Sequence, residues 1–431
     1  MRVAVIGAGA AGLCAAKNVK DLGFQCDVFE MRDTIGGIWV FTEQVGMDAY
    51  GYTVHTPMYK ELSTNLPKEV MYFTDFPWSV PFPQKNESFI TRGDVLDYLN
   101  KYADHFNIRP LVKLNCLVRN ICPVGDTCWE VTYLYKPTQE TITESYNVVM
   151  VCNGHYNIPA YPEILFQELF QGEKQHSRDY RHNGSYKGKR VLIIGSGPSG
   201  VDLTIQISQV AEYVILSNHS ATVAKQTYRE NVIKKPDVCR IVDHETVEFA
   251  DGTTCKCDVI LYCTGYQYSF PFLDDSCGVK IENAAVQPLY KHMVHIQRPT
   301  MCFIGLPYLV AAFLMFDIQT RYYCKYLEGS FKLPSTQDML EDTEEEKRWR
   351  SEKGIPSNRF HMMGLLEQKY YDNLAEEACI ARVPSVVAKI KFATKDRQTE
   401  DLKNYRKDRY VVLDDKNFVI YKSYSSRQRD C

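Results

Sequence analysis

Two glycine-rich stretches of this sequence have the spacing that binds the phosphates of a dinucleotide. Both follow the pattern G-x-G-x-x-G, with Gly7, Gly9 and Gly12 in one and Gly195, Gly197 and Gly200 in the other. The first glycine of such a stretch allows a tight turn, the second lets the backbone approach the pyrophosphate, and the third lets a helix pack closely on a strand. The N-terminus of that helix offers unpaired N–H groups to the phosphates. The sequence therefore predicts two dinucleotide-binding sites.

The first stretch is followed by an acid where a ribose would bind. Residues 3–6 are an apolar run, residues 13–22 have helical character, and residues 26–30 predict a short strand that ends in Glu30. In the dinucleotide fingerprint, the carboxylate at this place accepts the hydrogen bonds of a ribose diol. The residues expected to contact the first dinucleotide are Gly7, Gly9, Ala10, Ala11, Gly12 and Glu30.

The second stretch lacks that acid. The strand expected after its helix ends at Ser217 and Asn218, with no carboxylate. Because a carboxylate there would repel a ribose 2′-phosphate, its absence permits NADP, with Lys225 and Arg229 as candidate cations. The expected phosphate contacts are Ser196, Gly197, Pro198, Ser199 and Gly200. A nucleotide fold that has lost its ligand, or one that tolerates NADH, remains open at this point.

The pairing of these two sites predicts FAD with NADPH, since a flavin accepts hydride from a nicotinamide. Disulfide reductases share this layout but need a redox-active cysteine pair at the flavin. The chain has 15 cysteines, an odd number, and no Cys-x-x-Cys. We interpret the cysteines as buried, reduced thiols of an intracellular protein, and we expect no metal site. O2 is then the expected electron acceptor.

Further motifs surround the two glycine stretches. They are Gly36-Gly37-Ile38-Trp39, Phe170-x-Gly172-x-x-x-His176-x-x-x-Tyr180 and Thr264-Gly265. Together with the glycine stretches they resemble the flavin-containing monooxygenases, from Gly7 to about Leu333. The related Baeyer–Villiger monooxygenases usually end the second motif with Trp, so Tyr180 favours the former branch. The soluble character is similar to that of the insect branch, which includes pyrrolizidine-alkaloid N-oxygenases.

The resemblance implies roles for residues outside the glycine stretches. Asn65 matches the family's asparagine beside the flavin ring and is the expected catalytic residue, because its amide donates and accepts hydrogen bonds without titrating. A turn residue before Leu66-Pro67 is the alternative. The other expected FAD contacts are Gly37, Ile38, Trp39, His55, Thr64 and Gln319, and the other expected NADP contacts are Ser217, Asn218, Lys225 and Arg229. Many members carry an Arg just after Ser217, which is missing here, so the preference for NADPH is an expectation. His176 is interpreted as a hinge support.

The resemblance also implies a reaction. NADPH reduces FAD, O2 adds to the reduced flavin at its C4a carbon, and a tertiary amine or a sulfide takes the distal oxygen of the resulting hydroperoxide. The product is an N-oxide or an S-oxide, a chemistry used in xenobiotic detoxification. A Baeyer–Villiger oxygenase and a flavoprotein that passes electrons to a protein partner remain as alternatives.

Two α/β units are needed to position these residues. In the 431-residue chain we expect an FAD-binding domain over residues 1–165 and 292–431, with an NADP-binding domain inserted over 180–290. The predicted fold class is α/β with two Rossmann-like domains and mostly parallel sheets. Helical patterns at 338–349 and 365–378 predict a C-terminal part that buttresses the FAD domain.

Composition limits the partners. The formal net charge of −3 argues against a protein built to bind nucleic acid. The best apolar candidate for a membrane anchor, residues 303–316, is shorter than the roughly 20 residues that span a bilayer. We therefore expect a soluble homo-oligomer that acts on a small amine or sulfide with O2. The cytoplasm is the favoured compartment, and secretion remains open if a leader was trimmed.

Overall fold

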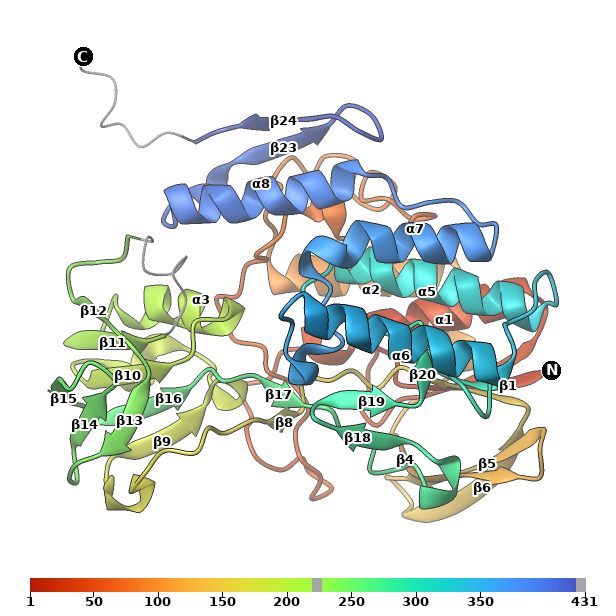
Figure 1. Cartoon of the computed structure of the whole chain (residues 1–431), viewed down its shortest axis with the longest axis horizontal. Helices are drawn as coiled ribbons and strands as arrows, with labels where there is room; N and C mark the ends of the chain where they lie inside the picture. The colour runs from red at the N-terminus through yellow and green to blue at the C-terminus, as the bar shows by residue number, and fades with distance from the viewer. Residues whose placement is uncertain (219–226, 424–431) are drawn as a thin grey trace.

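The fold is built on two separate, mostly parallel sheets, seen in a computed structural model that describes residues 1–218 and 227–423 (Figure 1). Within these residues the larger sheet has seven strands in the order β20-β21-β22-β7-β1-β2-β3. Their bounds are Arg2–Ile6 (β1), Gln25–Phe29 (β2), Val112–Lys113 (β3), Val148–Val151 (β7), Leu289–Tyr290 (β20), Val294–His295 (β21) and Met301–Phe303 (β22). Strand β1 pairs in parallel with β2 and β7, so its carboxyl end meets theirs at one edge.

The apolar character of β1 and β7 follows from their central place. Val3, Ala4 and Val5 are fully buried, as a strand covered on both faces of a parallel sheet must be. Helix α1 (Ala10–Asp21) covers one face, and α5 (Ala312–Leu327) packs alongside it. Helix α2 (Arg92–His105) begins with a capping box in which Thr91 and Asp94 exchange hydrogen bonds.

The second sheet lies at the left of Figure 1. In the described part of the chain it has five strands, in the order β12-β11-β10-β16-β9, all parallel. They are Glu173–His176 (β9), Arg190–Ile194 (β10), Tyr213–Ser217 (β11), Val232–Lys235 (β12) and Val259–Tyr262 (β16), with α3 at Pro198–Ile207. This sheet therefore lies in sequence between β7 and β20 of the first, as predicted for an inserted unit. The domain limits themselves stay a prediction.

Antiparallel ribbons extend the two units. Strands β4 (Cys116–Val124), β5 (Cys128–Tyr135) and β6 (Glu140–Tyr146) pack below the first sheet. Strands β13 (Val238–Ile241), β14 (Thr246–Phe249) and β15 (Thr254–Lys256) pair beside the second sheet. The short pairs are β8 (Ile158–Pro159) with β17 (Tyr266–Gln267), and β18 (Lys280–Glu282) with β19 (Ala285–Gln287).

The C-terminal part is mostly helical and covers the first unit. It contains α6 (Thr336–Glu352), α7 (Glu367–Glu377), α8 (Val386–Glu400) and a hairpin of β23 (Arg409–Val412) and β24 (Phe418–Tyr421). The helical patterns read at 338–349 and 365–378 are thus confirmed. Every helix in the described ranges is too short or too polar to cross a membrane.

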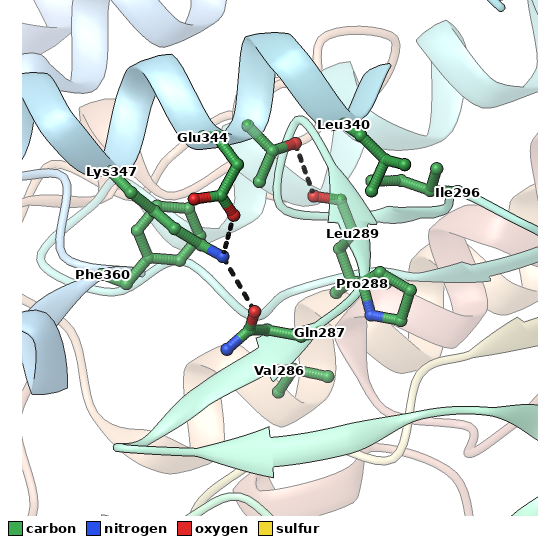
Figure 2. A pocket seen from close by; sticks show the side chains of 10 residues that line it. Val286, Gln287, Pro288, Leu289, Ile296, Leu340, Glu344, Lys347 and Phe360 are labelled. Carbon is green, nitrogen blue, oxygen red and sulfur yellow. Dashed lines mark hydrogen bonds and ion pairs between the residues drawn. The ribbon is translucent and has the colours of Figure 1, made fainter. Parts of the chain in front are cut away.

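A pocket lies between α6 and the β19–β20 connection (Figure 2). Leu289, Leu340 and Phe360 supply apolar walls. Lys347 Nζ donates hydrogen bonds to Gln287 Oε1 at 2.8 Å and to Glu344 Oε1 at 2.6 Å. No residue predicted to bind a nucleotide lines this pocket.

Candidate active site

The first glycine stretch forms a tight turn from β1 into α1. Gly7 has φ +106°, its N–H donates to the carbonyl of Phe29 at 2.8 Å, and an added Cβ would lie 2.7 Å from the carbonyl oxygen of Cys152. A Cβ on Gly12 would lie only 1.8 Å from the carbonyl oxygen of Gly7. The only described atoms near a Cβ on Gly9 belong to Gly37, the nearest at 3.5 Å. The fold thus requires Gly7 and Gly12, whereas Gly9 keeps a face open for close approach of a ligand.

Glu30 stands directly after β2 beside this turn. It is buried, and its two carboxylate oxygens accept the N–H groups of Ala8 and Arg32, both at 2.9 Å. Burial raises the pKa of Glu30, and these two donors oppose the rise. The carboxylate is therefore oriented toward the turn with acceptor capacity left, which fits the predicted contact with a ribose diol.

The segment with Ile38 and Trp39 lies over the same turn. The Gly36 N–H donates to the carbonyl of Ala8 at 2.9 Å, and a Cβ on Gly37 would lie 2.8 Å from Gly9 Cα. The 3-10 helix η1 (Gly37–Trp39) follows, and the Trp39 ring lies 6.5 Å from that of Phe313 on α5. The tertiary structure thus brings the predicted residues 37–39 to the predicted residues 7–12.

His55 has a buried ring nitrogen, Nε2, that makes no hydrogen bond to the described residues. Burial, then the guanidinium groups of Arg178 and Arg32, lower its pKa to about 4, so the ring is neutral near pH 7. An enclosed imidazole nitrogen without a partner fits a bound ligand at this place, which agrees with the predicted FAD contact.

Asn65 is exposed on a segment that is held in place by its neighbours. Thr64 is buried, its N–H donates to the carbonyl of Ile90 at 2.9 Å, and its Oγ1 accepts the Ile90 N–H at 3.2 Å. The Asn65 side chain is exposed and no described group hydrogen-bonds its amide. The Thr64 hydroxyl therefore hydrogen-bonds the backbone of Ile90, while the Asn65 amide can still hydrogen-bond a ligand.

Gln319 on α5 is fully buried and holds a loop. Its Oε1 accepts the Gly305 N–H at 2.9 Å, and its Nε2 donates to the Tyr370 hydroxyl at 2.7 Å. Gly305 lies two residues after the end of β22, so the Gln319 amide secures the connection from the first sheet to α5. A contact of Gln319 with flavin stays a prediction.

The second glycine stretch repeats the geometry of the first. Gly195 has φ +101°, a Cβ on it would lie 2.5 Å from the carbonyl oxygen of Cys263, and a Cβ on Gly200 would lie 1.9 Å from that of Gly195. No described atom lies within 4 Å of a Cβ on Gly197. Pro198 opens α3, whose N-cap Gly197 supplies no side-chain cap, and Ser196 and Ser199 lie half-buried beside it. The turn and the helix N-terminus fit the phosphates of a second dinucleotide.

The register of the strands identifies the counterpart of Glu30 in the second unit. The Gly7 N–H donates to the carbonyl of Phe29, and the Gly195 N–H donates to that of Ser217 at 3.1 Å. Asn218, one residue after Ser217, therefore stands where Glu30 stands in the first unit. The Ser217 hydroxyl is buried and donates to the carbonyl of Pro236 at 2.9 Å.

Cations near this position come from β12. The predicted contact Arg229 is exposed and lies three residues before β12, at the end of that strand away from Asn218, and Lys225 lies outside the described residues. Strand β12 places Lys234 and Lys235 beside Leu216 and Ser217. Sequence reasoning missed these two lysines, although the adjacent pair at the end of an apolar run was a visible signal.

His176 joins two strand ends. Its Nδ1 accepts the Arg178 N–H and its Nε2 donates to the carbonyl of Gly265, both at 3.1 Å. Burial lowers its pKa. These contacts tie β9 to the end of β16, which agrees with the hinge interpretation of this residue.

The chain is similar over its length to known oxygenases. Senecionine N-oxygenase of Tyria jacobaeae is 33% identical over 435 residues, covering 100% of this chain and 93% of that protein. The flavin-containing monooxygenase FMO GS-OX-like 2 of Arabidopsis thaliana is 35% identical over 395 residues, covering 88% of this chain and 84% of that one. The solved structure of S-allyl-L-cysteine S-oxygenase from Allium sativum has a TM-score of 0.89 and 31% identity, with 95% of each chain covered.

A family model described as flavin-binding monooxygenase-like matches residues 1–231 and 225–394. The matched residues include both glycine stretches, Glu30, Asn65 and Gln319. The chain therefore belongs to the flavin-binding monooxygenase-like family.

Proposed function

We propose that this protein transfers one oxygen atom from O2 to the nitrogen of a tertiary amine or the sulfur of a sulfide. It is a flavin-dependent monooxygenase, with FAD and NADPH as its cofactors. The observation that carries the proposal is the exposed, non-titrating amide of Asn65 on a segment pinned to Ile90. Such an amide can orient a ligand that has both donors and acceptors while no proton is lost from it.

The residues of the first unit hold FAD. The turn at Gly7–Gly12 and the N-terminus of α1 receive its pyrophosphate, and Glu30 receives a ribose. Ile38, Trp39 and His55 border the flavin. When bound, FAD supplies two-electron chemistry and the activation of O2. Because burial keeps the His55 imidazole neutral near pH 7, it can hold the ligand by a hydrogen bond and adds no charge.

The residues of the second unit hold NADPH. Ser196, Ser199 and the N-terminus of α3 receive the pyrophosphate. Asn218 replaces the acid that would repel a 2′-phosphate, and Lys234 and Lys235 are the cations that β12 brings beside it. Asn65 orients the nicotinamide against the flavin and takes no part in proton transfer.

The substrate class follows from the chemistry of the relatives. One is named for N-oxygenation of senecionine and another for S-oxygenation of S-allyl-L-cysteine. A tertiary amine, including the pyrrolizidine alkaloids, and a sulfide are both soft neutral nucleophiles that need no acid–base activation. The protein need only admit them and exclude water.

The test is incubation of the purified, FAD-loaded protein with NADPH and 18O2 and a panel of substrates. The panel holds tertiary amines, sulfides and one cyclic ketone, and the products are read by mass spectrometry. We expect one 18O atom in an N-oxide or S-oxide. A labelled lactone as the main product would indicate a Baeyer–Villiger oxygenase instead. NADPH oxidation with no labelled product from any substrate would contradict the proposal.

A further inference from the structure

Arg406 connects the Asn65 segment to the second unit. It lies in the 3-10 helix η10 (Tyr405–Lys407), between α8 and β23. Its Nε donates to the carbonyl of Thr64 at 3.0 Å, although the two residues are 342 positions apart in sequence. Its Nη1 pairs with Asp202 Oδ1 at 2.7 Å. One guanidinium therefore contacts both the residue before Asn65 and the helix α3 that follows the second glycine stretch.

Asp202 is a buried acceptor at the other end of this bridge. Its side chain is 8% exposed, and that of Arg406 is 24% exposed. Its second oxygen, Oδ2, accepts the hydroxyl of Tyr59 and the Nε2 of Gln206, the latter at 3.2 Å. A carboxylate so enclosed needs its cation, since removing one partner of a buried pair leaves the other charge uncompensated.

Arg406 is itself held firmly. Arg397 of α8 pairs with the buried Asp408 at 2.7 Å, and Asp408 also accepts the Ser423 N–H at 2.8 Å. The backbone next to Arg406 is thus anchored through Asp408 by contacts that do not involve the Asn65 segment. The guanidinium fork reaches two acceptors in fixed directions, which a single ammonium group does not reproduce.

We propose that Arg406 is a positioning residue, which sets the Asn65 segment in register with helix α3. The first unit holds the flavin and the second holds the nicotinamide, so Asn65 must stand in a fixed place relative to both. Ile90 fixes the segment to the first unit, and Arg406 fixes it to the second. This role rests on the function proposed above, because it concerns the residue that orients the nicotinamide there.

The experiment compares Arg406→Lys, Arg406→Gln and Asp202→Asn with the matched control Lys407→Gln. Lys407 is the adjacent exposed cation, which contacts only Asn404 among the described residues. All proteins are purified with FAD and checked for flavin content. Hydrogen exchange is followed by mass spectrometry for the peptide over residues 61–66, and peroxide release is measured per NADPH consumed.

We expect exchange of the 61–66 peptide to rise about tenfold in both Arg406 variants, because neither side chain reproduces the guanidinium fork that reaches the Thr64 carbonyl and Asp202 together. Peroxide per NADPH should rise roughly threefold, because a loosened Asn65 segment orients its ligand less well. Lys407→Gln should change neither. Because Arg406 and Asp202 act through one bridge, the double variant Arg406→Gln/Asp202→Asn should match Arg406→Gln alone.

The proposal is overturned if the 61–66 peptide exchanges as in the wild type in both Arg406 variants. It is equally overturned if Lys407→Gln produces the same effect, or if the effects of Arg406→Gln and Asp202→Asn add. The exchange measurement does not depend on turnover. An enzyme that oxygenates no amine or sulfide would therefore refute the proposed function while the exchange result still decides the bridge.

Discussion

The two glycine turns of this protein have nearly the same backbone geometry, but a different residue follows the second strand in each unit. Gly7 and Gly195 have φ values of +106° and +101°, and a Cβ on Gly12 or Gly200 would lie 1.8 or 1.9 Å from a carbonyl oxygen. The difference comes after the second strand, where Glu30 stands in one unit and Asn218 in the other. The turn is a common device for a pyrophosphate, and the choice of dinucleotide depends on that next residue.

The largest expected effect comes from filling the turn. Gly12→Ala puts its Cβ against the backbone of Gly7, so we expect loss of bound FAD and destabilisation of about 3 kcal/mol or more. Gly200→Ala should spare FAD but abolish flavin reduction by NADPH. Flavin absorbance per protein and anaerobic reduction rates measure the two outcomes.

Gly197→Ala is the control for this prediction, since no described atom lies within 4 Å of the added Cβ. It should fold normally and weaken only NADPH binding. If Gly200→Ala were as benign as Gly197→Ala, the geometric equivalence of the two turns would not hold in function.

The next effect concerns Asn65, which lies in neither turn. Asn65→Ala should lower oxygenated product about 100-fold, in the range seen when one preorganised donor is removed from an active site. Because the side chain is exposed, unfolding free energy should change by less than about 0.5 kcal/mol. Product and peroxide are quantified together. Wild-type yield of the N-oxide or S-oxide would show that the amide has no part in the reaction.

A tenfold change in cofactor preference should follow when the residue at position 218 is made acidic, like Glu30. Asn218→Asp places a carboxylate at the position equivalent to Glu30, where it repels a 2′-phosphate and accepts from a free ribose diol. We expect the ratio of kcat/KM for NADPH over NADH to fall about tenfold. This corresponds to about 1.4 kcal/mol of repulsion between the new carboxylate and the 2′-phosphate. Ser217→Asp is the comparison, one residue out of register. An unchanged ratio in Asn218→Asp would remove this position from cofactor selection.

A pH dependence of stability is expected from a buried histidine of the first unit. His295 on β21 is buried, its Nδ1 accepts the Arg298 N–H, and its Nε2 donates to the carbonyl of Cys277. Burial lowers its pKa to about 4, below the value near 6.5 of an unfolded chain. The neutral form is thus favoured by folding, so stability is present above about pH 6.5 and is lost as pH falls toward 4.

We expect this histidine to account for about 2 kcal/mol of the fall in unfolding free energy between pH 7 and pH 5. Denaturant titrations of wild type and His295→Gln at the two pH values measure it. The variant should show a shallower fall, and identical slopes would mean that His295 is not the titrating group.

Much of the site was readable in the sequence because it is local. Gly7, Gly9, Gly12 and Glu30 lie within one strand–turn–helix–strand unit, and each has a role set by backbone geometry. The same holds for the second turn and for the helical patterns of the C-terminal part. Roles for Asn65, His55 and Gln319 came from resemblance, since an isolated asparagine or histidine has no distinctive local pattern.

The sequence alone determined that two dinucleotide turns exist and that only the first is followed by an acid, because spacing along one chain settles both. The tertiary structure decided that β12 brings Lys234 and Lys235 beside the end of β11, where Asn218 stands in place of that acid. It also decided that Arg406 reaches Thr64 and Asp202. Such a contact depends on packing between segments hundreds of residues apart, and no local periodicity encodes it.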